Sequence, residues 1–180
     1  MLRREMGRLT IRCSMASRYS KTGIPQFAGP VPESPPVFRA QAMSISIRIN
    51  APLDVESFRD LLVASTLGER RPIHDRACLA GMLANGNLMA SAWEGEALVG
   101  IARCLTDFHY ACYLSDLAVD ARLQRQGLGR RLVEAVRGEL GPRCKLILIA
   151  APAADAWYER LGFERNPRCW TLAPDAMLRD

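Results

Sequence analysis

Two glycines and a group of long polar side chains stand together in the stretch DARLQRQGLGRR, residues 120–131. A strand-like pattern ends just before it at Val119, and apolar residues at helical spacing follow at Leu128, Leu132, Val136 and Leu140. Gly127 and Gly129 permit backbone conformations and close approaches that other residues resist. The first N–H groups of a helix are unpaired and lie at the positive end of its dipole. With side-chain donors from Gln124, Arg125, Arg130 and Arg131, the stretch has the chemistry of a diphosphate site.

The same spacing also fits a plain strand-to-helix turn with solvated arginines, because short glycine patterns are common. Two familiar phosphate motifs are excluded. The Walker loop requires GxxxxGK[ST], which the sequence lacks, and the Rossmann fingerprint requires GxGxxG, whose spacing differs from that of this stretch. The residues alone therefore leave the cradle and the turn open.

Length and composition indicate a soluble globular protein with one main domain. The chain has 180 residues, of which 49% are hydrophobic and 24% charged. The longest uncharged apolar run, residues 146–154, is too short to cross a bilayer. Residues 1–42 hold seven basic and two acidic side chains, so the net charge of +5 belongs to them and residues 43–180 are formally neutral. The neutral part has no overall electrostatic footprint for nucleic acid.

Residues 1–42 form a basic, proline-rich extension, and residues 43–180 form the predicted domain. We interpret the extension as a disordered arm, or as the product of a start codon assigned upstream of a true start at Met43. A mitochondrial transit peptide, which is Arg-rich and poor in acidic residues, is the alternative.

The cysteines and histidines indicate a reducing compartment and no metal site. The six cysteines include no CxxC pair, and His74 and His109 lack partner ligands at useful spacing. We expect a cytoplasmic protein.

Periodicity predicts a mixed sheet flanked by helices, in one α/β (α+β) domain. Asp54 and Asp75 are the expected N-caps of the first two helices. The run KLILIA (145–150) is expected as a buried central strand, and RCWTLA (168–173) as the last strand. The predicted order is β-α-α-β-β-β-α-β-α-β, with strands at 44–50, 87–93, 97–105 and 110–119 as well, and helices after Asp54 and Asp75, from residue 128, and at 155–162.

Three motifs together resemble the GNAT N-acetyltransferase superfamily. Gln124-Arg125-Gln126-Gly127-Leu128-Gly129 matches its Q/R-x-x-G-x-G/A signature. The strand ending LAV (117–119) and the helix WYERLGF (157–163) stand in the family's order and at roughly its spacing. The resemblance covers Met43 to the C-terminus and does not extend to residues 1–42.

The resemblance implies a sheet whose fourth and fifth strands splay apart, and acetyl-CoA as donor. It places the diphosphate on the backbone amides of Gln126 to Arg130, and the pantetheine along Leu117, Ala118 and Val119. One position departs from the family. Many members carry Asn seven residues before the tyrosine of the last motif, and this chain has Ala151 there, so one cofactor contact is replaced or missing.

Transfer of acetyl to an amine needs a neutral amine, donors to an oxyanion and a proton for the departing thiolate. Tyr158 is the predicted proton donor, because a phenol is protonated at neutral pH, and a core aromatic beside Trp157 is the alternative. Asp116 and Ser115 are the candidate bases, with bracing of the fold or a water relay as alternatives. Alternation places these two on opposite faces of their strand unless a bulge intervenes. The backbone N–H of Ala118 or Val119 is the expected donor to the oxyanion.

We therefore expect an acetyl-CoA-dependent N-acetyltransferase that acts on a primary amine of a small molecule. Protein acetylation at a lysine or an N-terminus is one alternative, and a catalytically inactive CoA-binding module is another. Arg70 and Arg71 would hold an acidic acceptor or form salt bridges on a solvated loop. Homodimers are frequent among family members, and the sequence does not identify the acceptor.

Overall fold

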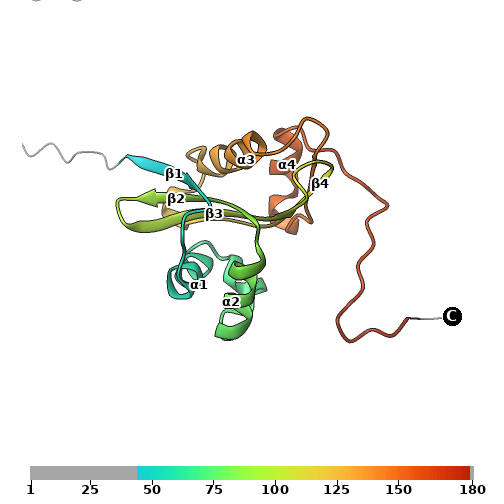
Figure 1. Ribbon diagram of the computed structural model, residues 1–180, viewed down its shortest axis with the longest axis horizontal. Helices are drawn as coiled ribbons and strands as arrows, with labels where there is room; N and C mark the ends of the chain where they lie inside the picture. Colours follow the sequence, from blue (N-terminus) through green and yellow to red (C-terminus); the bar gives the residue numbers. More distant parts are fainter. Residues whose placement is uncertain (1–43, 179–180) are drawn as a thin grey trace, which may run out of the picture. The chain divides into compact units, whose positions relative to one another are not determined.

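The computed structural model describes residues 44–178, so the predicted extension lies outside the described residues. Along the chain the elements alternate much as predicted (Figure 1). The helices and strands are β1 (Ile45–Ile49), α1 (Val55–Ala64), η1 (Leu67–Arg70), α2 (Arg76–Asn85), β2 (Leu88–Glu94), β3 (Ala97–Thr106), β4 (Ala111–Val119), η2 (Ala121–Leu123), α3 (Leu128–Gly138), β5 (Lys145–Ile147), η3 (Pro152–Ala154) and α4 (Asp155–Arg160).

The five strands form one mixed sheet in the order β1-β2-β3-β4-β5. Each neighbouring pair is antiparallel except β4 and β5, which run parallel. β5 pairs with β4 only from Ala111 to Tyr113, while β4 continues to Val119. The ladder between the two strands therefore ends at Tyr113, and the predicted splay beyond it stays a prediction.

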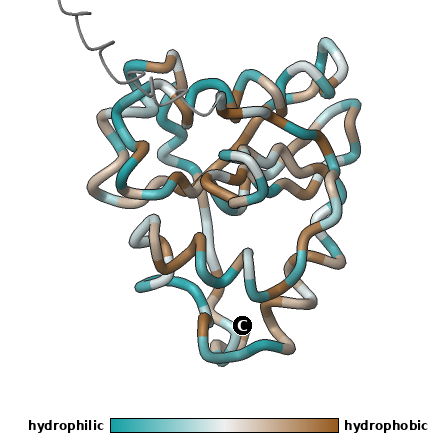
Figure 2. Tube along the Cα trace, turned by 90° about the vertical axis from the view of Figure 1, so that its left-hand side faces the viewer, coloured by the Kyte–Doolittle hydropathy of each residue, from teal (hydrophilic) through white to brown (hydrophobic). Residues whose placement is uncertain are grey.

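Two apolar cores lie on opposite faces of the sheet. On one face α3 buries Leu128, Leu132 and Val136 against side chains of β2, β3 and β4. On the other face α1 and α2 bury Phe58, Leu62 and Leu79 with Ile101 and Ala118. Figure 1 shows α3 on one side of the strands and α1 and α2 on the other. In Figure 2 hydrophobic stretches alternate with hydrophilic ones along the trace, as expected for elements that bury one face only.

The predicted buried central strand at KLILIA is wrong. β5 has only three residues and lies at the edge of the sheet, and Ile147 and Ile149 are 49% and 57% exposed. The expected last strand at RCWTLA is also wrong, because residues 168–173 form no helix or strand and Trp170 is 92% exposed. Pro167 and Pro174 flank this segment, and a proline cannot donate to a strand ladder. Without that strand, no described strand covers the outer edge of β5.

Candidate active site

The loop from Asp120 to Gly127 turns the chain from the end of β4 into α3. Its first residue remains in the ladder, since the N–H of Asp120 donates to the Val99 oxygen at 2.9 Å. Arg125 and Gly127 then adopt left-handed backbone, with φ of 61° and 82°. Nothing lies within 4 Å of a Cβ added at Gly127, so the backbone conformation alone favours glycine there. Left-handed residues in such a turn direct N–H groups into an anion-binding concavity.

The backbone N–H groups from Arg125 to Arg130 have no hydrogen-bond acceptor among the described residues. This row ends in the first turn of α3, where the helix dipole favours a negative charge. The side chains contribute less than expected. Those of Gln124, Gln126 and Arg130 are engaged by the Val119 oxygen, the Arg122 oxygen and Glu134, respectively. The predicted cradle thus has its free donors mainly on the backbone.

Gly129, the second glycine of the motif, lies where little space is left for a side chain. A Cβ at this position would lie 3.3 Å from Cζ2 of Trp157 and 3.9 Å from Cγ2 of Val119. The first turn of α3 therefore packs closely on α4 and on the end of β4. This contact brings all three motifs of the predicted site together.

The edge of β4 that faces away from β3 presents backbone groups of Leu117 and Val119. N–H directions alternate along a strand, and Asp120 donates to β3. Val119, opposite Gly100, and Leu117, opposite Ala102, therefore point to the edge that β5 leaves free beyond Tyr113. Of the two expected donors to an oxyanion, Val119 has its N–H on this edge, whereas Ala118 points toward β3.

A bulge interrupts β4 at Ser115. In the β3–β4 ladder Arg103 lies opposite Asp116 and Cys104 opposite Leu114, so Ser115 is the extra residue. Leu114 packs in the α3 core before the bulge, and Ala118 packs in the core of α1 and α2 after it. The bulge thus shifts the alternation of β4 by one residue, so even-numbered residues face the α3 core before it and the core of α1 and α2 after it.

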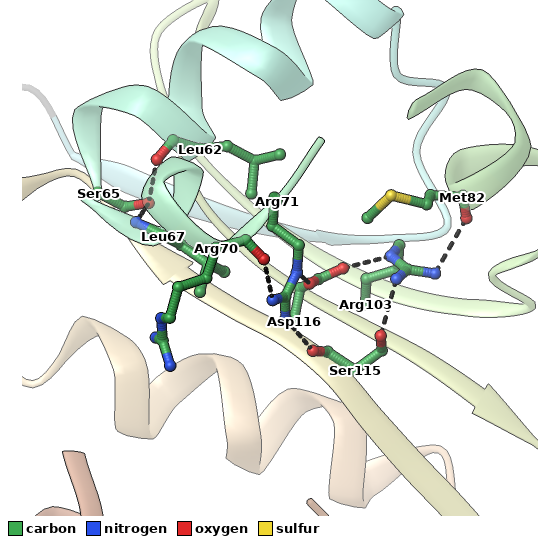
Figure 3. A network of polar contacts seen from close by, with 9 residues as sticks. All are labelled: Leu62, Ser65, Leu67, Arg70, Arg71, Met82, Arg103, Ser115 and Asp116. Carbon is green, nitrogen blue, oxygen red and sulfur yellow. Dashed lines mark hydrogen bonds and ion pairs between the residues drawn. The ribbon is translucent and has the colours of Figure 1, made fainter. Parts of the chain in front are cut away.

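Asp116 accepts from two arginines, which Figure 3 shows on either side of its carboxylate. The Nε atoms of Arg71 and Arg103 lie 2.5 Å from its two oxygens. Arg103 also donates through Nη2 to the Ser115 hydroxyl at 2.8 Å and through Nη1 to the Met82 oxygen at 3.1 Å. Arg71 donates through Nη2 to the Ser115 carbonyl at 2.8 Å. The side chain of Asp116 is fully buried.

Ser115 and Asp116, the two candidate bases, are thus brought together by the bulge, and both contact Arg103. Each carboxylate oxygen of Asp116 already accepts a charge-assisted hydrogen bond. Such an arrangement suits bracing of the strand. Arg71, expected to hold an acidic acceptor or to form a salt bridge on a solvated loop, forms one of these ion pairs, and its side chain is only 25% exposed.

The role of Arg103 was missed by the sequence reasoning, although a signal was present. It stands in the apolar run ALVGIARCL, and charged residues are rarely buried without a partner. Asp116 likewise stands inside an apolar run, YLSDLAV, in the next strand. Opposite charges inside two consecutive buried strands could have been paired from this pattern.

Tyr158 lies half-buried in α4, between aromatic neighbours. Its ring packs edge-on against Trp157 at 4.9 Å and Phe163 at 5.5 Å between ring centres. Burial raises the pKa of the phenol, and the positive charge of Arg70 acts in the opposite direction. A raised pKa keeps the proton on the phenol at neutral pH. Tyr158 also lines an open groove with Leu146 and Leu148, next to β5.

Among residues 44–178, no helix has both the length and the hydropathy to span a membrane. Within the same range, no three His, Cys, Asp or Glu side chains cluster closely enough to hold a metal ion.

Comparison with known proteins identifies the family. A family model described as Acetyltransferase (GNAT) domain matches residues 65–168. The soybean (Glycine max) protein named Histone acetyltransferase TAP1 is 32% identical over an alignment of 111 residues, which covers 54% of this chain and 47% of that protein. The Arabidopsis thaliana protein named GCN5-related N-acetyltransferase 2, chloroplastic, is 34% identical over 76 residues, 41% of this chain and 30% of that protein. The chain thus spans less than half the length of these curated relatives.

Solved structures share the fold. A probable acetyltransferase from Staphylococcus aureus superposes with a TM-score of 0.60 at 19% identity, covering 74% of this chain and 100% of that one. An aminoglycoside N-acetyltransferase in complex with CoA gives a TM-score of 0.58 at 19% identity, covering 74% and 96%. At these identities the likeness concerns the fold alone. Because the family model covers more than half of its residues, the chain belongs to the GNAT acetyltransferase family.

Proposed function

We propose that this chain is an acetyl-CoA-dependent N-acetyltransferase that acts on a primary amine of a small molecule. The observation that carries the proposal is the row of free backbone N–H groups from Arg125 to Arg130 at the start of α3. A row of amides at the positive end of a helix suits a diphosphate. It adjoins the end of β4, where β5 no longer pairs and the strand edge is free.

The residues present fit acetyl-CoA, which when bound supplies an activated acetyl group. The amides from Gln126 to Arg130 would hold the diphosphate, and the free backbone groups of Leu117 would bind the amide-containing arm. Ala151, the departure from the family pattern, is the N-cap of η3 and makes no side-chain capping bond. The amides of the cradle come from other residues, so the contact that is replaced or missing here lies outside the row of free N–H groups.

Tyr158 would protonate the leaving thiolate. Its phenol has a pKa raised by burial, so it retains its proton at neutral pH and can donate it as negative charge develops on sulfur. The N–H of Val119 is the proposed donor to the acetyl oxygen, because it lies on the free edge of β4.

We propose that Asp116 and Ser115 brace the site and that water removes the proton from the acceptor. Two guanidinium groups occupy both carboxylate oxygens of Asp116, and the Ser115 hydroxyl accepts from Arg103. Proton uptake by Asp116 would weaken two charge-assisted hydrogen bonds in a buried site. A relay of water molecules would pass the proton to bulk solvent without breaking these bonds.

Acetylation of a protein lysine or N-terminus is the second candidate, because one relative is named a histone acetyltransferase. The formally neutral charge of residues 43–180 favours the small molecule, since a basic histone tail would be attracted by a strongly acidic surface. An inactive CoA-binding module would retain the cradle without turnover.

A thiol-release assay distinguishes these functions. The full chain is incubated with acetyl-CoA and a panel of small primary amines, lysine peptides and free-N-terminal peptides, with mass spectrometry of the products. We expect release to be stimulated by small amines, with an increase of 42 Da in one amine. Stimulation by peptides alone would support the second candidate. CoA binding without release on any amine would indicate the inactive module.

A further inference from the structure

Asp116 has two arginine partners although one would balance its charge. Arg103 lies opposite it in the ladder, and their side chains are 6% and 0% exposed. This pair is neutral, buried and hydrogen-bonded on its own. Arg71 comes from a segment 45 residues earlier in the sequence and adds a second positive charge at 2.5 Å. Charge balance in the core therefore does not explain Arg71.

Arg71 does connect two backbones. Its Nη2 donates to the carbonyl of Ser115, the extra residue of the β4 bulge, at 2.8 Å. Its Nη1 donates to the carbonyl of Arg70, the last residue of η1, at 2.8 Å. A bulge leaves one residue outside the ladder. The planar guanidinium thus fastens the end of η1 to the irregular point of β4 through several directed bonds.

The two connected segments border the proposed reaction site. After the bulge, β4 presents Leu117 and Val119 on its free edge. On η1, Arg70 turns away from Asp116 while Arg71 turns toward it (Figure 3), and the charge of Arg70 reaches the phenol of Tyr158. A shift of η1 relative to the bulge would therefore change the arrangement of the strand edge, Arg70 and Tyr158.

We propose that Arg71 is a positioning residue for acetyl transfer, which holds η1 and the β4 bulge in one arrangement. The inference rests on the proposed function. The proposal gives Arg71 a role different from that of Arg103. The aliphatic part of Arg103 also packs against the end of α2, since a Cβ on Gly86 would lie 3.0 Å from its Cγ. Arg103 holds the core together, and Arg71 aligns the site.

The kinetic test uses the full chain with Arg71→Met, Arg71→Lys and the control Arg76→Met, which removes an exposed arginine of α2 that pairs with Glu56. Arg71→Met leaves the Arg103–Asp116 pair neutral, so the fold and CoA affinity should be retained. The kcat with the best amine should fall about 10²-fold, the loss that a 1 Å misplacement produces. The KM for the amine should rise while that for acetyl-CoA stays unchanged. Arg71→Lys should recover only part of kcat, because an ammonium cannot make the planar fork.

Hydrogen exchange gives a readout that needs no acceptor. In Arg71→Met, amides of residues 67–71 and of the bulge should exchange faster, while those of α3 should not change. Parent-like kcat, or unchanged exchange at η1 and the bulge, would overturn the proposal. Equal losses of CoA affinity, melting temperature and kcat would also overturn it, since they indicate a general structural role. If no amine is acetylated by the parent, the proposed function fails, and the exchange experiment still decides whether Arg71 fastens η1 to β4.

Discussion

Gly129 and Trp157 pack so closely that a Cβ at position 129 would require a small movement of the Trp157 ring. An added Cβ would lie 3.3 Å from the Trp157 ring. One contact therefore links the first turn of α3, where the free amides end, to the helix that carries Tyr158. Any side chain at position 129 should disturb the cradle and α4 together.

Gly129→Glu should abolish CoA binding. The carboxylate would repel a diphosphate, and its Cβ would displace Trp157. The measurement is the rise in melting temperature on addition of CoA, together with calorimetric affinity. Gly138→Glu is the matched control, because Gly138 lies in the same helix with nothing within 4 Å of an added Cβ. Binding by Gly129→Glu with parent affinity would disprove the cradle assignment.

Asp116→Asn should reduce stability. The substitution leaves Arg103, which is 6% exposed, beside a neutral amide in a buried site. Loss of one partner of a buried ion pair costs about 3–5 kcal/mol in the free energy of unfolding. Urea denaturation measures this loss. Asp60→Asn, in the exposed pair with Arg59, should leave the midpoint almost unchanged.

Asp116→Asn also tests whether Asp116 braces the strand or acts as a general base. If Asp116 is a brace, any variant that remains folded should keep the low-pH limb of the parent's kcat/KM profile. Disappearance of that limb together with unchanged stability would instead assign Asp116 as the base.

The helices were predictable because their signals are local. Asp54 and Asp75 cap α1 and α2 as expected, each accepting from the backbone N–H three residues later. The spacing of apolar residues likewise predicted α3. The edge strands were less predictable, since an apolar run such as KLILIA fits a buried or an edge strand equally well. Its place in the sheet depends on whether the distant segment RCWTLA pairs with it. The residues of these two segments do not indicate whether they pair.

The parts of the site that were predictable are those where the local backbone or the available space favours one type of residue. Gly127 and Gly129 indicated the cradle, one through its backbone conformation and one through lack of space. The positive φ of Arg125 has no such signal, because arginine rarely adopts it. The bulge at Ser115 depends on the register between β3 and β4, and the Arg71–Asp116 pair joins segments far apart in sequence. Both follow from tertiary packing rather than from local pattern.

Deleting residues 1–42 should leave folding and CoA binding unchanged. Those residues carry the basic excess and many of the prolines, while every contact of the cradle described above lies within residues 44–178. The melting temperature and CoA affinity of the 43–180 fragment should equal those of the full chain. A fragment that is insoluble or binds CoA more weakly would show that residues 1–42 contribute to the domain.

Tyr158→Phe should reduce turnover with little effect on packing or CoA affinity. The variant keeps the ring that packs on Trp157 and Phe163 and removes only the hydroxyl. A positioned general acid contributes about 10²–10⁴-fold, and the loss should appear in kcat because the proton is transferred in the transition state. Tyr110→Phe is the control for loss of a hydroxyl, because Tyr110 lines the same groove but is 67% exposed and has no proposed catalytic role.

The pH profile tests the same assignment independently. Burial raises the pKa of the Tyr158 phenol above its ordinary value of 10.0, so the parent should keep its activity up to that pH and lose it as the phenol ionises. Tyr158→Phe should lack this high-pH loss. Because the folded pKa exceeds the unfolded one, the proton also stabilises the folded state below pH about 10, and this stabilisation should decline as pH rises through the folded pKa. The variant should show a smaller decline between pH 9 and 11, measured by urea denaturation. Near-parent kcat in Tyr158→Phe, or the same alkaline limb in both proteins, would show that another group or water supplies the proton.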